Sequence, residues 1–200
     1  MKIFSVVVLA AGAFWFVHSH QERWLKPALP GVSARLSESG GEGYHFAPEE
    51  NLERLDIAQL RGARQTVDAA MYAFTDLALA KALRELGERG VTVRLYRDRG
   101  QYEAEELKAT RFGQSSSTRL LLGVRNVHIR VKQGSERNLM HLKAACIDGK
   151  ILRDGSANWS PSGEKSHDDN ARFSTNPDEI RRFQRVFEAM WTRSGNRIIQ

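Results

Sequence analysis

Apolar residues recur every three or four positions in several stretches of the chain, which is the spacing of an amphipathic helix. This spacing predicts four helices, over residues 49–64, 77–89, 102–110 and 178–193. The second is bounded most clearly, because Asp76 is a suitable N-cap and Gly90 a suitable helix end. Helices are therefore expected both in the first half of the chain and close to its end.

Runs of apolar, β-branched and aromatic residues lie between these helices. They predict strands over residues 44–46, 66–74, 91–97, 127–131, 140–147, 150–153 and 170–174. In the first half, a strand, a helix and a strand follow one another, an order suited to a parallel crossover. The centre is rich in strands, and Gly149-Lys150 forms a tight turn between two of them. The expected fold class is α/β, with a mixed β-sheet sandwiched by helices.

The first twenty residues contain a single charged side chain, Lys2, and Ile3–Val17 is an uncharged, mostly apolar stretch. Such a stretch is typical of a signal peptide or an N-terminal membrane anchor. The small residues Ala11-Gly12-Ala13 favour cleavage, whereas the apolar residues that follow them favour an anchor, so both interpretations stay open. We expect an exported (periplasmic or secreted) or membrane-anchored protein, with residues 21–43 as a flexible linker rich in Pro, Gly and Ser.

The charge, cysteine and histidine content of the chain limit which substrates and cofactors are expected. The 200 residues carry a formal net charge of +6, which is compatible with a polyanionic substrate but does not require one. The single cysteine, Cys146, excludes an internal disulfide. Histidines outside the central motif are scattered at His18, His20, His45, His128 and His167. They do not form a metal-binding pattern of the usual kind, so we expect neither a metal nor another cofactor.

Groups that can bind or attack a phosphate are concentrated between residues 141 and 158. The pattern is H-x-K, four residues, D, six residues and G-S-x-N, formed by His141, Lys143, Asp148, Gly155, Ser156 and Asn158. Imidazole can attack phosphorus when neutral and donate a proton when charged, and an ammonium group can neutralise the phosphate oxygens. Side chains two residues apart in a strand point to the same face, so His141 and Lys143 should lie together. The run resembles the HKD motif of the phospholipase D superfamily, which implies a phospholipase D-like α/β/α fold.

The chain has one such motif, so it resembles the single-motif branch, in which two chains form one active site. This resemblance implies a homodimer in which His141 attacks phosphorus and forms a phosphohistidine, while the partner subunit's His141 protonates the leaving oxygen. Lys143, Ser156 and Asn158 would bind the phosphate. Asp148 is expected to orient neighbouring groups rather than to contact the phosphate.

Asp169 lies eleven residues after Asn158, where single-motif nucleases often have a glutamate that supports the nucleophilic histidine. By resemblance, Asp169 is a candidate for that role, although its side chain is one methylene shorter than glutamate. The alternative is an acidic residue of a solvated turn.

The resemblance and the basic composition favour a metal-independent nuclease that acts on DNA or RNA, with residues 44–195 as the phospholipase D-like catalytic domain. One alternative is a phospholipase D that hydrolyses phosphatidyl headgroups at a membrane, where the N-terminal segment would hold it. The other is a non-catalytic scaffold that binds nucleic acid. The fold alone cannot choose among them.

Overall fold

The computed structural model describes residues 41–134 and 137–200. The elements, in chain order, are β1 (Gly43–Phe46), α2 (Leu52–Arg61), β2 (Thr66–Met71), α3 (Leu77–Glu88), β3 (Thr92–Arg97), α4 (Arg99–Arg111), the 3₁₀ helix η1 (Arg119–Leu121), β4 (Val127–Val131), β5 (Lys143–Ile147), β6 (Ile151–Gly155), α5 (Pro161–Lys165), β7 (Asn170–Ser174), α6 (Pro177–Trp191) and β8 (Arg197–Ile199). The predicted signal or anchor segment, and the predicted linker up to residue 40, lie outside the described residues.

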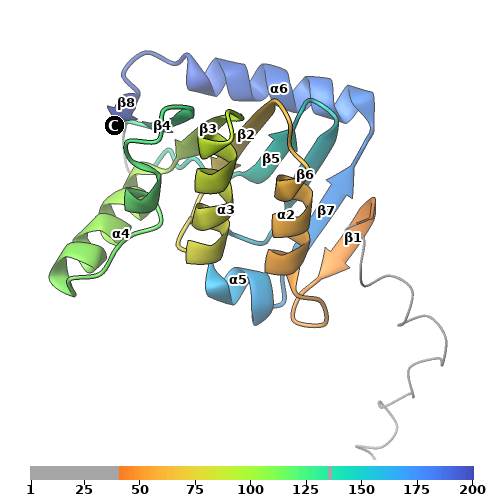
Figure 1. Ribbon diagram of the computed structural model, residues 1–200, viewed down its shortest axis with the longest axis horizontal. Helices are drawn as coiled ribbons and strands as arrows, with labels where there is room; N and C mark the ends of the chain where they lie inside the picture. Colours follow the sequence, from red (N-terminus) through yellow and green to blue (C-terminus); the bar gives the residue numbers. More distant parts are fainter. Residues whose placement is uncertain (1–40, 135–136) are drawn as a thin grey trace, which may run out of the picture. The chain divides into compact units, whose positions relative to one another are not determined.

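The strands form a sheet in the order β1-β7-β6-β5-β2-β3-β4-β8 (Figure 1). Strands β2, β3 and β4 are parallel, whereas the other pairings are antiparallel, so the sheet is mixed as predicted. Met71 pairs with Arg97 and with Lys143, and Arg97 pairs with Val131. The carboxyl ends of the three parallel strands therefore meet the start of β5 at one edge of the sheet.

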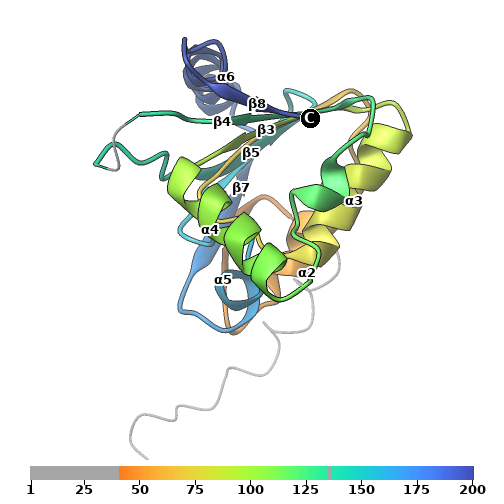
Figure 2. The same cartoon turned by 90° about the vertical axis from the view of Figure 1, so that its left-hand side faces the viewer.

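Helices cover both faces of the sheet. Helix α6 lies on one face, and α2 and α3 lie on the other (Figure 2). The buried side of α6 consists of Ile180, Phe183, Phe187, Met190 and Trp191. On the opposite face, the buried leucines include Leu60, Leu79, Leu83 and Leu86. Burial of this apolar area is the main favourable contribution to folding, and the arrangement confirms the predicted α/β class.

The predicted elements are present, with ends set by local hydrogen bonds. Helix α3 is capped as predicted, because the carboxylate of Asp76 accepts from two backbone amides of the first turn. The predicted strand 66–74 ends early, at Met71, because Ala73 N donates to a side chain, Asn158 Oδ1, at 3.1 Å. The predicted strand 140–147 begins only at Lys143, since Met140 N donates to Asp98 Oδ2 at 3.0 Å. His141 therefore precedes β5.

Three short elements lie outside the predicted pattern, η1, α5 and β8. Helix α5 has five residues and β8 has three, which is too short for a periodic signal. The sheet consequently extends past residue 195. Within residues 41–134 and 137–200, no helix combines the length and apolar character needed to cross a bilayer.

Candidate active site

His141 and Lys143 lie together at the edge where β5 begins. Lys143 Nζ is 3.2 Å from His141 Nδ1 and 3.3 Å from Nε2, and it donates to the His141 carbonyl at 2.9 Å. Lys143 is buried, whereas the His141 side chain is exposed. Burial lowers the pKa of Lys143, and the charge of Asp169 opposes this shift. An exposed imidazole beside a fixed ammonium is an arrangement that can attack a phosphate and neutralise its oxygens.

Tyr72, for which the sequence predicts no role, packs against both side chains of this pair. Its ring centroid is 4.4 Å from that of His141, and Lys143 Nζ lies 5.0 Å from the same ring centroid. The Tyr72 hydroxyl accepts from Gln101 Nε2 at 3.1 Å. Tyr72 follows β2, and only the pairing of β2 with β5 brings it to the motif. That pairing has no local signal in the sequence.

Asn158 faces the same edge from the loop after β6. Its Oδ1 accepts a hydrogen bond from Ala73 N at 3.1 Å, so the position of the amide group is fixed by backbone. The amide nitrogen is then the end that can donate to a phosphate oxygen. This geometry is compatible with the predicted phosphate-binding role of Asn158.

Ser156 links the ends of β6 and β7. Its Oγ accepts from Asn170 N at 2.9 Å, and its backbone N donates to Asn170 Oδ1 at 3.2 Å. The hydroxyl hydrogen can still donate to a phosphate. Gly155 permits this approach, because it has φ +146° and a Cβ there would lie 2.2 Å from Asn170 O. A side chain at position 155 would therefore push the two strands apart.

Asp148 is the one motif residue that the structure does not bring to this group. Strand β5 separates it from Lys143, a distance of roughly 16 Å at the usual rise per strand residue. The carboxylate accepts from the backbone amides of Arg64, Gln65 and Thr66 at 2.8, 2.8 and 2.9 Å. Burial alone would raise the pKa of Asp148, but these donors lower it below its ordinary value. Asp148 thus holds backbone at the far end of the strand, which is compatible with the expectation that it orients neighbouring groups rather than contacts the phosphate.

Asp169 lies on the Lys143 side of the site. Its negative charge raises the pKa of Lys143 against the effect of burial. Its carboxylate Oδ2 lies 3.8 Å from His167 Nδ1, and its backbone oxygen accepts from Ala47 N at 2.9 Å. Among the described residues, no hydrogen bond joins Asp169 to His141. Support of the nucleophile by Asp169 therefore stays a prediction.

Residues 57–191 match the family described as cardiolipin synthase, PLD-like domain, and the match covers more than half of the chain. The chain belongs to this phospholipase D-like family. A mitochondrial cardiolipin hydrolase from Chlamydomonas reinhardtii is 28% identical over 148 residues, which cover 74% of this chain and 60% of that protein. The mitochondrial cardiolipin hydrolase of Mus musculus is 29% identical over 143 residues, or 72% and 59% of the two chains. The chain thus spans about 60% of the length of these relatives.

Solved structures confirm the phospholipase D-like fold. NucT from Helicobacter pylori superposes with a TM-score of 0.66 at 22% identity, over 76% of this chain and 95% of that one. Nuc from Salmonella typhimurium, a phospholipase D family member, gives 0.66 at 20% identity, over 78% and 96% of the two chains. The resemblance that the motif suggested is therefore confirmed for the family and the fold.

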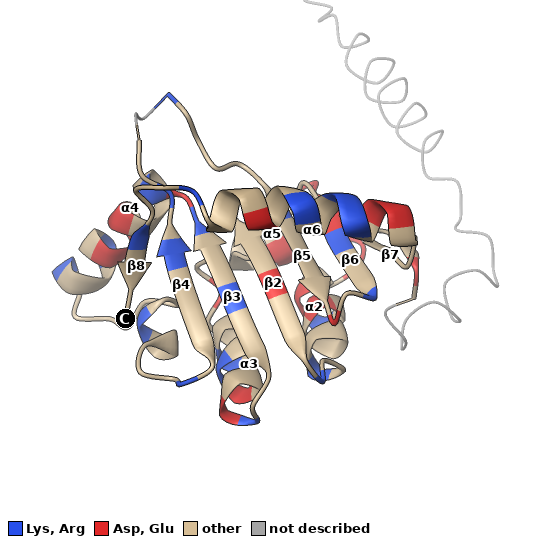
Figure 3. Cartoon of the chain, turned by 90° about the horizontal axis from the view of Figure 1, so that it is seen from above, with Lys and Arg blue, Asp and Glu red and all other residues tan. Residues whose placement is uncertain are grey.

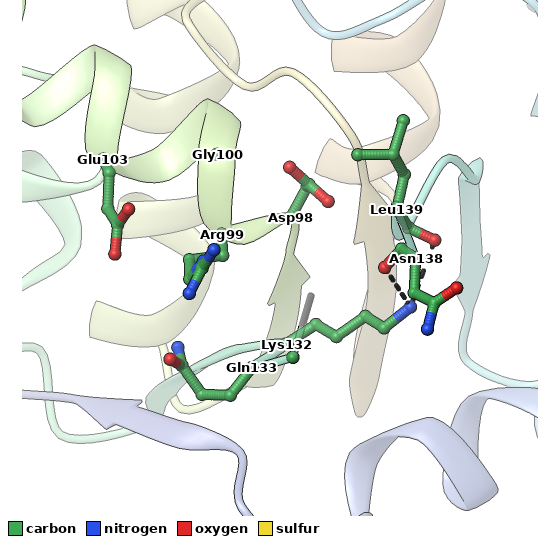
Figure 4. A pocket seen from close by; sticks show the side chains of 9 residues that line it. Asp98, Arg99, Gly100, Glu103, Lys132, Gln133, Asn138 and Leu139 are labelled. Carbon is green, nitrogen blue, oxygen red and sulfur yellow. Dashed lines mark hydrogen bonds between the residues drawn. The ribbon is translucent and has the colours of Figure 1, made fainter. Parts of the chain in front are cut away.

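A cavity of about 230 Å³ opens beside the motif of this phospholipase D-like domain (Figure 4). Its lining includes Leu139, which lies two residues before His141. Lys132 Nζ donates to the carbonyls of Asn138 and Leu139 at 2.5 and 3.2 Å. Asp98 joins the cavity to the site, because its carboxylate accepts from both Gln101 N in α4 and Met140 N. The cavity and His141 thus share one edge of the sheet.

Proposed function

We propose that this chain is a hydrolase that cleaves phosphodiester bonds through a phosphohistidine on His141. The observation that carries the proposal is the contact between the Lys143 ammonium group and the exposed His141 imidazole. An imidazole nitrogen attacks phosphorus, a phosphorus–nitrogen bond forms, and the bond to the leaving oxygen breaks. Water then attacks the phosphohistidine, so that histidine and a phosphate monoester are released. Lys143 and Asn158 neutralise and hold the oxygens that gain charge in each transition state.

The first step needs an acid that protonates the leaving oxygen, and His141 cannot serve as both nucleophile and acid. We propose a symmetric homodimer in which the partner subunit's His141 provides this proton. Two exposed leucines support an interface here, because Leu139 and Leu142 flank His141 and are 49% and 39% exposed. Co-expression of wild type with excess His141→Ala should give heterodimers that are largely inactive. Heterodimers with half the wild-type rate, or an active monomer, would contradict the shared site.

Nucleic acid is the favoured substrate, and the metal-independent reaction is the favoured mechanism. Lys and Arg lie at the carboxyl end of β4 and on β8 (Figure 3). A wider hollow of about 590 Å³ beside the site adds Arg137 and Arg193 to its lining. Cations along such an edge favour a polyanion that extends beyond the cleaved phosphate. No three His, Cys, Asp or Glu side chains in the described part of the chain gather where they could hold a metal.

A phospholipid is the second candidate substrate, and a specific observation favours it. The relatives with the similarities given above are called cardiolipin hydrolases. The exposed leucines beside His141 would also suit contact with acyl chains. Anchoring by the uncharged N-terminal stretch would bring the site to a membrane surface.

One assay separates these possibilities. The full chain is incubated in excess EDTA with single-stranded and double-stranded DNA, with RNA, and with vesicles that contain cardiolipin or phosphatidylcholine. Cleavage of nucleic acid with little lipid turnover is the expected result, and cleavage of lipid alone would favour the second candidate. Binding of nucleic acid without cleavage of any substrate would contradict the enzymatic proposal and indicate a scaffold. His141→Ala is the matched control for any contaminating activity.

We also propose that the full-length chain is exported or membrane-associated, because residues 3–17 carry no charge. Fractionation should find it in the membrane, or outside the cytosol at a reduced mass. An unprocessed chain in the cytosolic fraction would contradict this proposal.

A further inference from the structure

A fully buried arginine lies beneath the candidate active site. Arg153, in the middle of β6, has no exposed surface. Its Nε is 3.2 and 3.1 Å from the two carboxylate oxygens of Asp56, and its Nη2 is 3.0 Å from Asp56 Oδ2. Nη2 also donates to Glu164 Oε1 at 3.1 Å. The guanidinium thus connects β6 with α2, which holds Asp56, and with α5, which holds Glu164.

The same guanidinium forms hydrogen bonds with the backbone on both sides of the site. Arg153 Nη1 donates to the carbonyl of Lys143 at 3.1 Å and to that of Ala157 at 2.9 Å. Lys143 is itself a site residue, and Ala157 immediately precedes Asn158. With these bonds, all three nitrogens of the Arg153 guanidinium donate to an acceptor. Because one planar group bonds both carbonyls, it fixes the distance between the start of β5 and the loop that carries Asn158.

The charges in this cluster balance only if one carboxyl group is neutral. Burial raises the pKa of Glu164 to about 10, and the negative charge of Asp56 adds to the shift. Glu164 is therefore protonated at neutral pH, and the positive charge of Arg153 is balanced by Asp56. Trp159 Nε1 donates to Asp56 Oδ2 at 2.9 Å and holds that carboxylate in place.

A cluster of this kind contributes little net stability, because the cost of desolvating its charges offsets their attraction. Stability therefore does not explain why Arg153 also bonds the carbonyls of Lys143 and Ala157 beside the site. Groups that act on a transition state need their positions fixed before the reaction, and a displacement of about 1 Å can cost a hundredfold in rate.

We infer that Arg153 is the positioning residue of the site. Its guanidinium group holds Lys143 and Asn158 at the spacing that the transition state at phosphorus requires. The inference rests on the proposed phosphodiesterase function. It assigns Arg153 no contact with substrate, because the side chain is fully buried. It assigns Glu164 the role of a neutral hydrogen-bond partner.

The test compares Arg153→Lys with Glu164→Gln in the full chain. Lysine keeps the positive charge but cannot reach both carbonyls and both carboxyl groups, so kcat should fall by about 10- to 100-fold with KM nearly unchanged. Glutamine mimics the neutral acid, so Glu164→Gln should keep kcat within about twofold of wild type. Affinity for orthovanadate, which forms five-coordinate complexes like the transition state, should fall in Arg153→Lys in parallel with kcat. Melting temperatures establish that each variant is folded.

Several results would overturn the inference. A folded Arg153→Lys chain with wild-type kcat would do so, as would a rise in KM alone. If Arg153→Lys does not fold, Asp56→Asn provides the test, because it weakens the ion pair that holds the Arg153 guanidinium. The kcat of Asp56→Asn should fall with KM unchanged. An unchanged kcat would refute the positioning role of Arg153. Absence of wild-type turnover would count against the proposed function instead, and vanadate affinity would then test Arg153. A wild-type chain without turnover and without vanadate binding would overturn both.

Discussion

The aromatic ring of Tyr72 packs against the imidazole of His141, with 4.4 Å between ring centroids and 58° between ring planes. The same ring lies 5.0 Å from Lys143 Nζ. One aromatic side chain thus limits the movement of both groups that would act on phosphorus. Its own orientation is held by the hydrogen bond from Gln101.

This contact predicts different outcomes for two substitutions of Tyr72. Tyr72→Ala should lower kcat by about tenfold, because His141 and Lys143 lose the surface that orients them. Tyr72→Phe keeps the ring and loses only the bond to Gln101, so it should retain most of the rate. Steady-state kinetics on folded variants provide the measurement. Equal rates for wild type and Tyr72→Ala would show that Tyr72 does not orient His141 or Lys143.

The lowered pKa of Lys143 predicts the alkaline side of the pH–rate profile. The ammonium form neutralises the phosphate, so activity should decline as pH rises through the pKa of Lys143. Since burial lowers that pKa, the decline should begin below the ordinary lysine value of about 10.4. Lys143→Arg stays charged over this range, so the decline should be absent from whatever rate that variant keeps. A wild-type rate that is constant to above the ordinary lysine pKa would contradict the assignment.

Asp148 should matter for stability rather than for chemistry. Asp148→Ala removes the acceptor of three backbone amides and should lower the free energy of unfolding by about 2 kcal/mol. Asp148 also has φ +52°, a conformation that asparagine tolerates better than alanine, so Asp148→Asn should lose less. Chemical denaturation measures the stability, and kcat on the folded fraction should stay near wild type. A folded Asp148→Asn chain without activity would contradict this expectation and indicate a catalytic role.

The carboxylates of the turn before β7 provide another matched pair. Asp169 acts electrostatically on Lys143, so Asp169→Asn should slow turnover by several-fold. Asp168→Asn, which changes the charge equally in an exposed neighbour, should have a much smaller effect. Rates that are equal and close to wild type in both variants would assign Asp169 to the solvated turn.

The sequence was sufficient for the parts of the fold that have a local signal. Helix α3 with its Asp76 cap and the strands around the motif hairpin follow from spacing and from capping residues. The contact between His141 and Lys143 was also predictable, because side chains two residues apart in an extended segment share a face. Helix α5 and strand β8 were not predictable, because each is shorter than the period of the pattern that would reveal it.

What the sequence could not provide depends on contacts between distant segments. Tyr72 reaches His141 only through the register of β2 with β5, in which Met71 pairs with Lys143. Arg153 and Asp56 are 97 residues apart and meet only when α2 packs beneath β6. Asp148 is the converse case, because it is close to His141 and Lys143 in the sequence but not in space. Its spacing fits the motif, yet the length of β5 places it away from the site. Motif spacing identifies residue types, whereas position along a strand decides which of them meet.

Covalent labelling of His141 tests the central claim most directly. The full chain is mixed with a ³²P-labelled phosphodiester in excess EDTA, quenched within one turnover and digested, and the labelled peptide is sequenced. We predict label on His141 that is stable to alkali and labile to acid, with no label in His141→Ala and an undiminished rate in EDTA. Turnover without labelled His141, or activity that EDTA abolishes and magnesium restores, would contradict the phosphohistidine mechanism.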